Sequence, residues 1–335
     1  MTSSPLHLLR LPILNTIQIF DSMEIIDQFI ISFCSKKTLL IVKDHCNKRV
    51  SLRVHLGKHV ETQLFGQPYR GLTGVTVHPN PSEIGEEVKI KERTISVKMV
   101  EMEDGQRILM TYYKDRSFHL ALHIAALVEY LCELFHGVID IPMDRLTINN
   151  ENQWISDVNL EKILWSVECR HLIMDLESNT FRLNDFYKSI DIFESHRANW
   201  ISIDNLITID SMHIKVTGTN FTNLQINRFL KYWNRNVGSF RLKFFAVRVD
   251  DFNENVAFQG IDLYLVNADT RYYTAPDGTI YKFGNREIHR RDDSTASIIY
   301  WEQLRLFGLA VWPDANGISN YLDAVQQIFP RFVWR

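Results

Sequence analysis

The sequence predicts a mixed α/β protein, with a small helical module at the N-terminus and a larger domain of strands and helix–strand units. Three successive patterns of apolar spacing indicate this arrangement: helical spacing up to about residue 45, alternation of period two from 49 to 113, and alternating helical and extended segments from about 117. The 335 residues are 45% hydrophobic, which is enough for a sizeable core and two domains.

The first 45 residues have the spacing of short amphipathic helices. Pro12 suits the start of a helix, and Ile13, Ile17 and Phe20 follow at helical intervals. A second apolar run at 25–33 lies beyond a turn-forming Asp-Ser pair at 21–22. A module this small cannot bury all its apolar side chains alone. Either it caps its own domain, or a partner completes its apolar face.

The N-terminal motif resembles an F-box, in the variant found in the nematode F-box families. The pattern is Pro-Leu-x-Leu-Leu-x-Leu-Pro at 5–12, then Ile-Ile-x-x-Phe-x-x-Ser-x-x-Ser-Lys-Lys at 25–37. This resemblance implies a surface that binds a Skp-type adaptor. The residues expected on it are Pro5, Leu6, Leu8, Leu9, Leu11, Pro12, Ile17, Ile25, Ile26, Phe29, Ser32, Ser35 and Lys36.

A second resemblance covers the C-terminal half. Residues 221–233 carry an Asn, then Phe-Leu-Lys and Trp, and an Arg-Leu pair follows at 241–242. With the segments 287–292 and 309–313, this order resembles the nematode F-box-associated region of the second type (FBA_2).

We expect four regions: an F-box at 5–45, a β-rich segment at 46–116, helix–strand units at 117–250, and a β-rich segment with a closing helix at 251–335. A strand is predicted at 38–42, at the end of the first region, and strands at 49–56, 72–78, 94–102 and 107–113 in the second. In the third, helices at 118–135, 158–167, 184–196 and 222–234 precede strands at 138–141, 171–176, 200–209 and 241–249. The recurrence of these units suggests a leucine-rich-repeat-like arc. In the fourth, strands are predicted at 260–266, 271–274, 279–283, 288–291, 295–301 and 304–311, and a helix at 318–329.

Composition limits the class of partner. The net charge of -3 does not favour nucleic acid. The longest apolar stretch, 118–135, contains two His and two Glu, so no membrane partner is expected. Four scattered cysteines and the absence of a secretory pattern at the start favour a cytoplasmic or nuclear protein that is not secreted.

Residues with catalytic or metal-binding potential do not form a recognisable pattern. Cys46, His55 and His59 have no fourth ligand at a suitable spacing, and His119 and His123 lack the Glu of a metalloprotease helix. Glycine-rich phosphate loops, nucleophile elbows and kinase motifs are absent. We therefore expect no catalytic residues, no metal and no cofactor.

The two resemblances together imply a substrate-recognition adaptor of a cullin–RING ubiquitin ligase of the SCF type. The F-box would bind a Skp-type adaptor and through it a cullin, while the C-terminal region would hold an unknown target protein. Two alternatives stay open: an F-box scaffold that promotes no ubiquitination, and an unrelated enzyme in the α/β region. The sequence does not identify the residues that bind the target.

Overall fold

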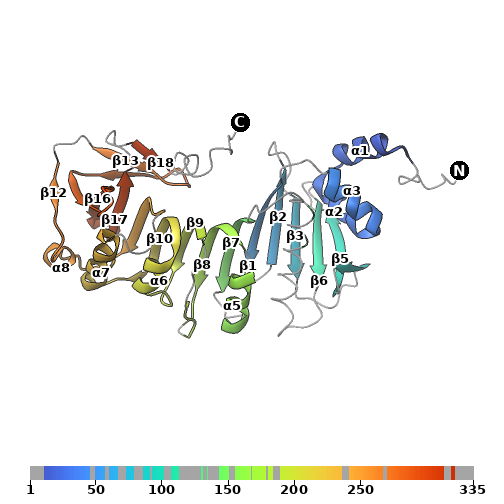
Figure 1. Cartoon of the computed structure of the whole chain (residues 1–335). Helices are drawn as coiled ribbons and strands as arrows, with labels where there is room; N and C mark the ends of the chain where they lie inside the picture. The colour runs from blue at the N-terminus through green and yellow to red at the C-terminus, as the bar shows by residue number, and fades with distance from the viewer. Residues whose placement is uncertain are drawn as a thin grey trace. The chain divides into compact units, whose positions relative to one another are not determined.

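The computed structural model describes residues 11–45, 50–56, 60–66, 73–78, 86–90, 93–101, 107–112, 130, 134, 143–150, 155–166, 168–178, 180–183, 189–235, 241–266, 270–312 and 318–320. The chain forms two compact units (Figure 1). Unit 1 comprises residues 1–150 and 154–169, and unit 2 comprises 151–153 and 170–335. The mixed α/β class predicted from the sequence is confirmed.

Unit 1 begins with three helices of equal length, α1 (Ile13–Ser22), α2 (Ile25–Cys34) and α3 (Lys36–His45). Both α1 and α2 pack against α3, and α2 also contacts strands β4 and β6. The buried apolar side chains of the three helices are Phe20, Ile26, Phe29, Ile41 and Val42. The predicted helical N-terminus is therefore confirmed.

The sheet of unit 1 has the strand order β7-β1-β2-β3-β6-β5-β4. The pairs β1–β2, β2–β3, β5–β6 and β4–β5 are antiparallel, whereas β1–β7 and β3–β6 are parallel. The strands are β1 (Val50–Leu56), β2 (Val60–Gly66), β3 (Thr73–His78), β4 (Glu86–Ile90), β5 (Arg93–Glu101), β6 (Arg107–Tyr112) and β7 (Met143–Asn150), and helix α5 (Asp157–Ser166) also belongs to this unit.

The larger sheet of unit 2 has the order β12-β15-β16-β17-β11-β10-β9-β8. Four parallel strands follow the chain order, from β8 (Cys169–Leu176) through β9 (Ser189–Arg197) and β10 (Asp210–Asn220) to β11 (Phe244–Arg248). The remaining strands are antiparallel: β12 (Tyr264–Leu265), β15 (Arg286–His289), β16 (Thr295–Trp301) and β17 (Leu306–Trp312).

Short helices connect the strands of unit 2. They are α6 (Ile203–Thr208), α7 (Asn223–Asn234), α8 (Glu254–Ala257) and a 3-10 turn, η2 (Glu302–Leu304). Helices α6 and α7 lie side by side (Figure 1). A second sheet, in the order β14-β13-β18, contains β13 (Arg271–Thr274), β14 (Ile280–Phe283) and β18 (Ile318–Asn320).

The register of the four parallel strands defines two faces. Leu172, Phe193, Ile214 and Phe245 form an apolar row across one face, and Phe229 of α7 stacks on Phe245 at 3.8 Å. On the opposite face one row contains His171, Ile192, His213 and Phe244, and the next contains Ile173, Glu194, Lys215 and Ala246. The small sheet packs on this second face, since Tyr273 and Tyr281 contact Phe244.

The strand predicted at 38–42 is wrong, because these residues lie in α3. The β-branched residues of this segment favour a strand, but a capping interaction between Ser35 and Thr38 starts a helix instead. The backbone N–H of Thr38 donates to Oγ of Ser35 at 3.1 Å, and the N–H of Ser35 donates to Oγ1 of Thr38 at 3.0 Å. Packing of Ile41 and Val42 against the other helices then outweighs their strand propensity.

The helix predicted at 184–196 and the strand predicted at 200–209 are also wrong. Residues 189–197 form strand β9, and helix α6 occupies 203–208; 184–188 lie outside the described residues. Because β9 is a parallel strand covered on both faces, its buried residues run almost continuously and lack an alternating pattern. Ser202, as the N-cap, starts α6 by accepting from the N–H of Asn205.

The remaining differences concern the C-terminus and the middle of the chain. The closing helix predicted from 318 begins instead as strand β18, which pairs with β13. Of the helix predicted at 118–135, only Tyr130 and Leu134 are described, and both are helical. The strand predicted at 138–141 lies outside the described residues. The other predicted elements match α5, α7, β1, β3, β5, β6, β8, β11 and β12–β17, with shifts at some ends.

Candidate functional site

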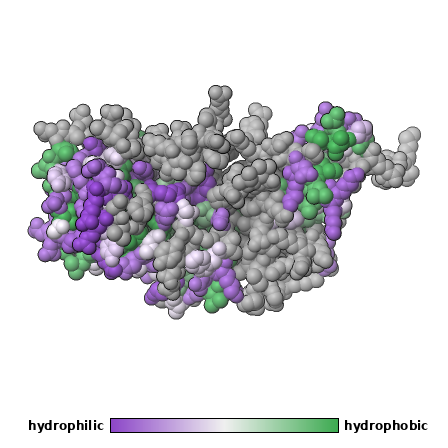
Figure 2. All heavy atoms as spheres, in the orientation of Figure 1, coloured by the Kyte–Doolittle hydropathy of each residue, from purple (hydrophilic) through white to green (hydrophobic). Residues whose placement is uncertain are grey.

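The helices of unit 1 expose apolar side chains at their surface. Ile13 and Leu14, in the first turn of α1, are 55% and 70% exposed, and Leu40 of α3 is 56% exposed. Figure 2 shows hydrophobic atoms in green gathered over these helices. Apolar side chains on a small helical module are the usual anchors of a protein–protein contact.

The residues predicted to bind an adaptor fall into three groups. Pro12, Ser35 and Lys36 are exposed and Leu11 and Ile17 are half-buried, whereas Ile26, Phe29 and Ser32 are buried. Pro5, Leu6, Leu8 and Leu9, and the side chain of Ile25, lie outside the described residues.

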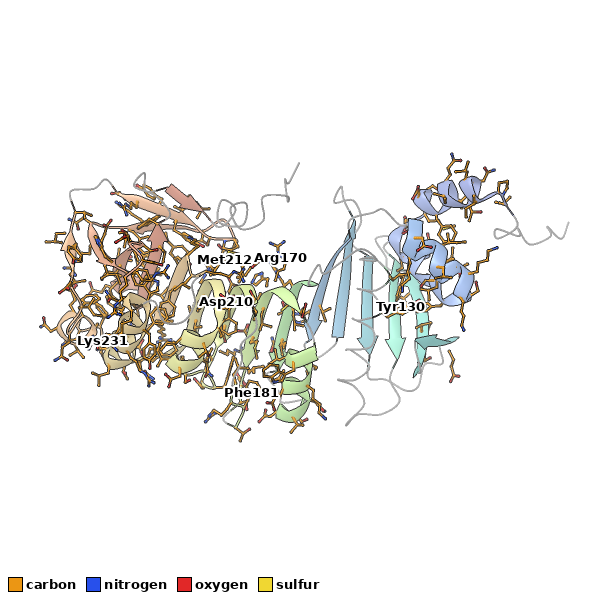
Figure 3. The ribbon with its side chains drawn as sticks, viewed as in Figure 1. Tyr130, Arg170, Phe181, Asp210, Met212 and Lys231 are labelled. Carbon is orange, nitrogen blue, oxygen red and sulfur yellow. The ribbon has the colours of Figure 1, made fainter. Side chains whose placement is uncertain are left out.

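The buried group holds the module together. Phe29 packs edge-on against Phe33 at 4.6 Å and lies 6.1 Å from Tyr130, measured between ring centroids. The hydroxyls of Ser32 and Tyr130 are 2.8 Å apart, and Tyr130 lies below the helices in Figure 3. Ile26 is fully buried. These three side chains therefore form interior contacts of unit 1 in the free chain.

A buried amide fixes the angle between α1 and α2. Nε2 of Gln28 donates to the carbonyl oxygen of Phe20 at 2.7 Å and to that of Met23 at 3.3 Å. These bonds satisfy carbonyl groups at the end of α1 and hold its exposed first turn in place. Ile13, Leu14 and Leu40 were missing from the predicted set. Leu14 could have been found from the sequence, since it lies off the helical face that Thr16 and Phe20 bury.

Unit 2 contains a polar cluster on the face beneath its small sheet. Nε2 of His171 lies 3.6 Å from one carboxylate oxygen of Glu194, and Nε2 of His213 lies 3.9 Å from the other. Nδ1 of His213 is within hydrogen-bond distance of the Tyr273 hydroxyl, at 3.2 Å. The His213 ring stacks on Phe244 at 4.6 Å and lies 6.0 Å from the Tyr273 ring, measured between centroids, and its side chain is fully buried.

The cluster has strongly shifted pKa values. Burial alone would raise the pKa of Glu194, but its interactions with His171, His213 and Lys215 outweigh burial and lower the pKa to about 2. Burial lowers the pKa of His213 to about 3, against the opposing effect of Glu194. The carboxylate is thus held ionised and the His213 imidazole neutral.

A second polar network joins the starts of the parallel strands. Asp191, on β9, accepts from Nε of Arg170 at 2.9 Å and from a guanidinium nitrogen of Arg241. Nη1 of Arg241 also lies 3.4 Å from Oδ2 of Asp210. Arg241 belongs to the Arg-Leu pair of the C-terminal motif. The network gives Arg241 a structural role. It links Arg170 of β8, Asp210 of β10 and Arg241, just before β11, to the buried carboxylate of Asp191 on β9.

Helix α7 is the central element of the C-terminal motif. Its N-cap Thr222 accepts from the N–H of Gln225, whose side chain accepts from the Thr222 N–H, forming a capping box. The apolar residues Ile226, Phe229, Leu230 and Trp233 are buried against the sheet. Nδ2 of Asn227 donates to the carbonyls of Ala257 and Gln259. Apart from Lys231, the motif residues of α7 are thus packing residues and caps.

These arrangements can bind and position other molecules, and none shows a nucleophile activated by a base. Within the described ranges, no group of three or more His, Cys, Asp or Glu side chains could hold a metal ion. No helix in the described part of the chain is long and apolar enough to cross a membrane. The structure thus defines a class: a mixed α/β protein with a helical N-terminal module and a second α/β unit.

Comparison with known families identifies this class. Residues 8–50 match the F-box domain, and residues 178–247 match the F-box associated domain. The chain therefore carries an F-box domain and an F-box associated segment of the second type. No curated protein and no solved structure matches it. F-box domains in general bind Skp-type adaptors in SCF complexes, and the domain pair is typical of non-enzymatic adaptors. The associated domain corresponds to the described segments from Ser178 through β9, α6, β10 and α7 into β11.

Proposed function

We propose that this protein is a substrate-recognition adaptor of an SCF-type cullin–RING ubiquitin ligase. In this proposal the F-box helices bind a Skp-type adaptor, which joins the chain to a cullin, and unit 2 holds a target protein. The observation that carries the proposal is the exposed apolar turn at Ile13 and Leu14, on a module that matches the F-box. Each of these side chains is more than half exposed in the described part of the chain, and the adaptor would cover it.

The proposed contact surface combines exposed residues and the preceding motif. It includes Leu11, Pro12, Ile17, Ser35 and Lys36, with Ile13, Leu14 and Leu40 added because of their exposure. Pro5, Leu6, Leu8, Leu9 and Ile25 stay in the proposal on the motif alone. Ile26, Phe29 and Ser32 support the surface from inside, so substitutions there would act through folding.

The protein would act by proximity and supply no reactive group. It would bring a lysine of the target close to a charged ubiquitin-conjugating enzyme, and positioning of this kind lowers a barrier without a catalytic side chain. We further propose that β8–β11 and their helices form a leucine-rich-repeat-like arc that presents the target, and that the protein works in the cytoplasm or nucleus. This proposal needs no cofactor, metal, nucleic acid or membrane.

The test is direct binding of the intact chain. Purified full-length protein is mixed with a Skp-type adaptor and a cullin and run on a gel-filtration column. Co-elution of all three is expected, and a chain lacking residues 1–45 should elute alone. Failure of the intact chain to bind would refute the adaptor proposal. A scaffold without ligase activity would bind in the same way, but no bound partner would become ubiquitinated when the charged conjugating enzyme is added.

A further inference from the structure

Helix α7 presents a row of cations on the side that faces away from the core. Arg228, Lys231 and Arg235 are spaced by three and four residues, which places them on one helical face. The helix contains no acidic residue between 223 and 234. Arg291 lies beside its C-terminal end, because its backbone N–H donates to the carbonyl of Asn234 at 3.1 Å. We call these four residues the α7 cationic row.

The cationic row is held on a rigid support. The opposite face of α7 is buried by Ile226, Phe229, Leu230 and Trp233, and the capping box fixes its first turn. Nδ2 of Asn234 donates to the carbonyl of His289 at 2.7 Å, which ties the last turn to the β15–β16 hairpin. Figure 3 shows Lys231 on the outer side of this helix. A partner that binds here would not need to order the helix first.

The charges of the row are only partly balanced. Arg228 pairs with Asp204 of α6 at 2.8 Å, with about half of each side chain exposed. In the described part of unit 2, Lys231, Arg235 and Arg291 have no carboxylate within ion-pair distance. The nearby carboxylate of Asp292 is taken by Arg290, and Asp293 is exposed in the same turn. Cations therefore outnumber carboxylates at this end of α7.

Lys243, a neighbouring lysine, also reflects the local excess of positive charge. Burial lowers the pKa of Lys243, and the charge of Arg290 lowers it further. Arg290 itself is nearly buried and stacks over the Trp233 ring at 5.4 Å. The positive charge around the row is thus built into the core of the motif as well as its surface.

We propose that the α7 cationic row binds an acidic segment, rich in Asp or Glu, of the target protein. This inference rests on the proposed adaptor function, and it assigns a substrate class and a binding face to unit 2. Charge complementarity selects the occupant. The spacing favours several carboxylates over one phosphate, because Arg228 and Arg235 are separated by about 10 Å along the helix axis. A single phosphate is best held where several cations converge on one point.

The test uses full-length protein and a fluorescein-labelled oligoglutamate peptide, with binding followed by fluorescence anisotropy. We expect saturable binding near 0.1 M salt, where the screening length is about 10 Å, and loss of binding near 1 M salt. The double variant Lys231→Glu/Arg235→Glu should weaken binding by about tenfold or more, because attraction becomes repulsion. The matched control Arg182→Glu/Lys282→Glu changes two exposed cations of unit 2 elsewhere and should stay within about twofold of wild type.

A neutral variant separates the loss of positive charge from destabilisation of the helix. A negative charge at the C-terminal end of α7 opposes the helix dipole, so Lys231→Gln/Arg235→Gln is measured in parallel and should also weaken binding. Equal losses in the test and control pairs would overturn the proposal. So would tighter binding of a singly phosphorylated serine peptide, or of single-stranded RNA, than of oligoglutamate. Adaptor binding by the F-box is measured on the same samples. If the α7 variants lose peptide binding but still bind the Skp-type adaptor, the acidic-segment proposal is supported independently of the adaptor proposal.

Discussion

Helices α1 and α7 have similar lengths but differ in their N-terminal caps and in the side chains that they expose. Helix α7 starts with a reciprocal capping box, buries four apolar side chains and exposes cations. Helix α1 starts after Pro12 without a side-chain cap, buries only Thr16 and Phe20, and exposes Ile13 and Leu14. Helix α7 thus buries its apolar face within unit 2, whereas α1 keeps two large apolar side chains exposed, as the proposed adaptor surface requires.

The largest expected effect concerns the closed core beneath the small sheet of unit 2. Phe244 is fully buried, and its ring lies 4.6 Å from both His213 and Tyr273. Phe244→Ala should lower the free energy of unfolding by about 3–5 kcal/mol, because it removes apolar area and leaves a cavity. Leu40→Ala, at an exposed position of the F-box, should change it by no more than about 0.5 kcal/mol. Urea unfolding followed by tryptophan fluorescence measures both. Similar shifts for the two variants would contradict the contrast between a closed and an open surface.

The second effect is the pH dependence of the same core. The pKa of His213 is about 3 in the folded chain, against an ordinary 6.5. As the pH falls below 6.5, His213 becomes protonated in the unfolded chain but stays neutral in the folded chain. The free energy of unfolding therefore falls until about pH 3. Glu194, with a pKa of about 2 against 4.5, adds a further loss below pH 4.5. Acid should therefore destabilise unit 2 in two overlapping steps.

Substitution of His213 isolates the first step. Because the slope for one proton approaches about 1.4 kcal/mol per pH unit, His213→Phe should remove roughly 2–3 kcal/mol of the stability lost between pH 6.5 and 4.5. His196→Gln, at an exposed histidine of β9, should leave the profile unchanged. Denaturant unfolding at several pH values measures this. Parallel profiles for wild type and His213→Phe would show that the buried imidazole does not control acid stability.

Sequence reasoning recovered the elements whose spacing reflects local packing. Helices α1, α2, α5 and α7 show a helical period because each buries one face, whereas the strand predicted at 38–42 lies in helix α3. It failed for β9, where burial on both faces removes the alternation that marks a strand. The candidate surface was predicted as a motif, but the division between its exposed and buried residues was not. That Ile26 and Phe29 face inward depends on the packing of α2 against α3 and on the contact of Phe29 with Tyr130, which no local pattern contains.

The third effect compares α1 and α7 directly. Leu14 and Leu224 are each the second residue of their helix, and they are 70% and 67% exposed. An aspartate in the first turn suits the helix dipole, so neither Leu14→Asp nor Leu224→Asp should destabilise the fold. Leu14→Asp should weaken binding of a Skp-type adaptor by about tenfold or more, whereas Leu224→Asp should leave it unchanged. Calorimetric titration with purified adaptor measures both.

A third substitution controls for charge in this experiment. Asn15→Asp adds the same charge to the exposed first turn of α1 without removing an apolar side chain. If it weakened adaptor binding as much as Leu14→Asp, electrostatics rather than apolar contact would dominate the interface. Ile26→Asp, by contrast, should unfold the F-box helices, because it places a charge at a fully buried site. Circular dichroism separates this loss of structure from a loss of contact.

The smallest expected effect measures how much the N-terminal cap stabilises the first turn of α7. Thr222→Ala removes the hydroxyl that accepts from the Gln225 N–H, and it should cost about 1 kcal/mol of stability. Thr222→Ser keeps that acceptor and should cost much less. Because α1 has no side-chain cap, Pro12→Ser would offer one there and should stabilise α1 slightly or leave it unchanged. Hydrogen exchange of the first-turn amides reports each helix separately. If Thr222→Ala left the α7 amides as protected as before, packing of the buried face would hold that turn without help, and the capping difference between the two helices would have no energetic consequence.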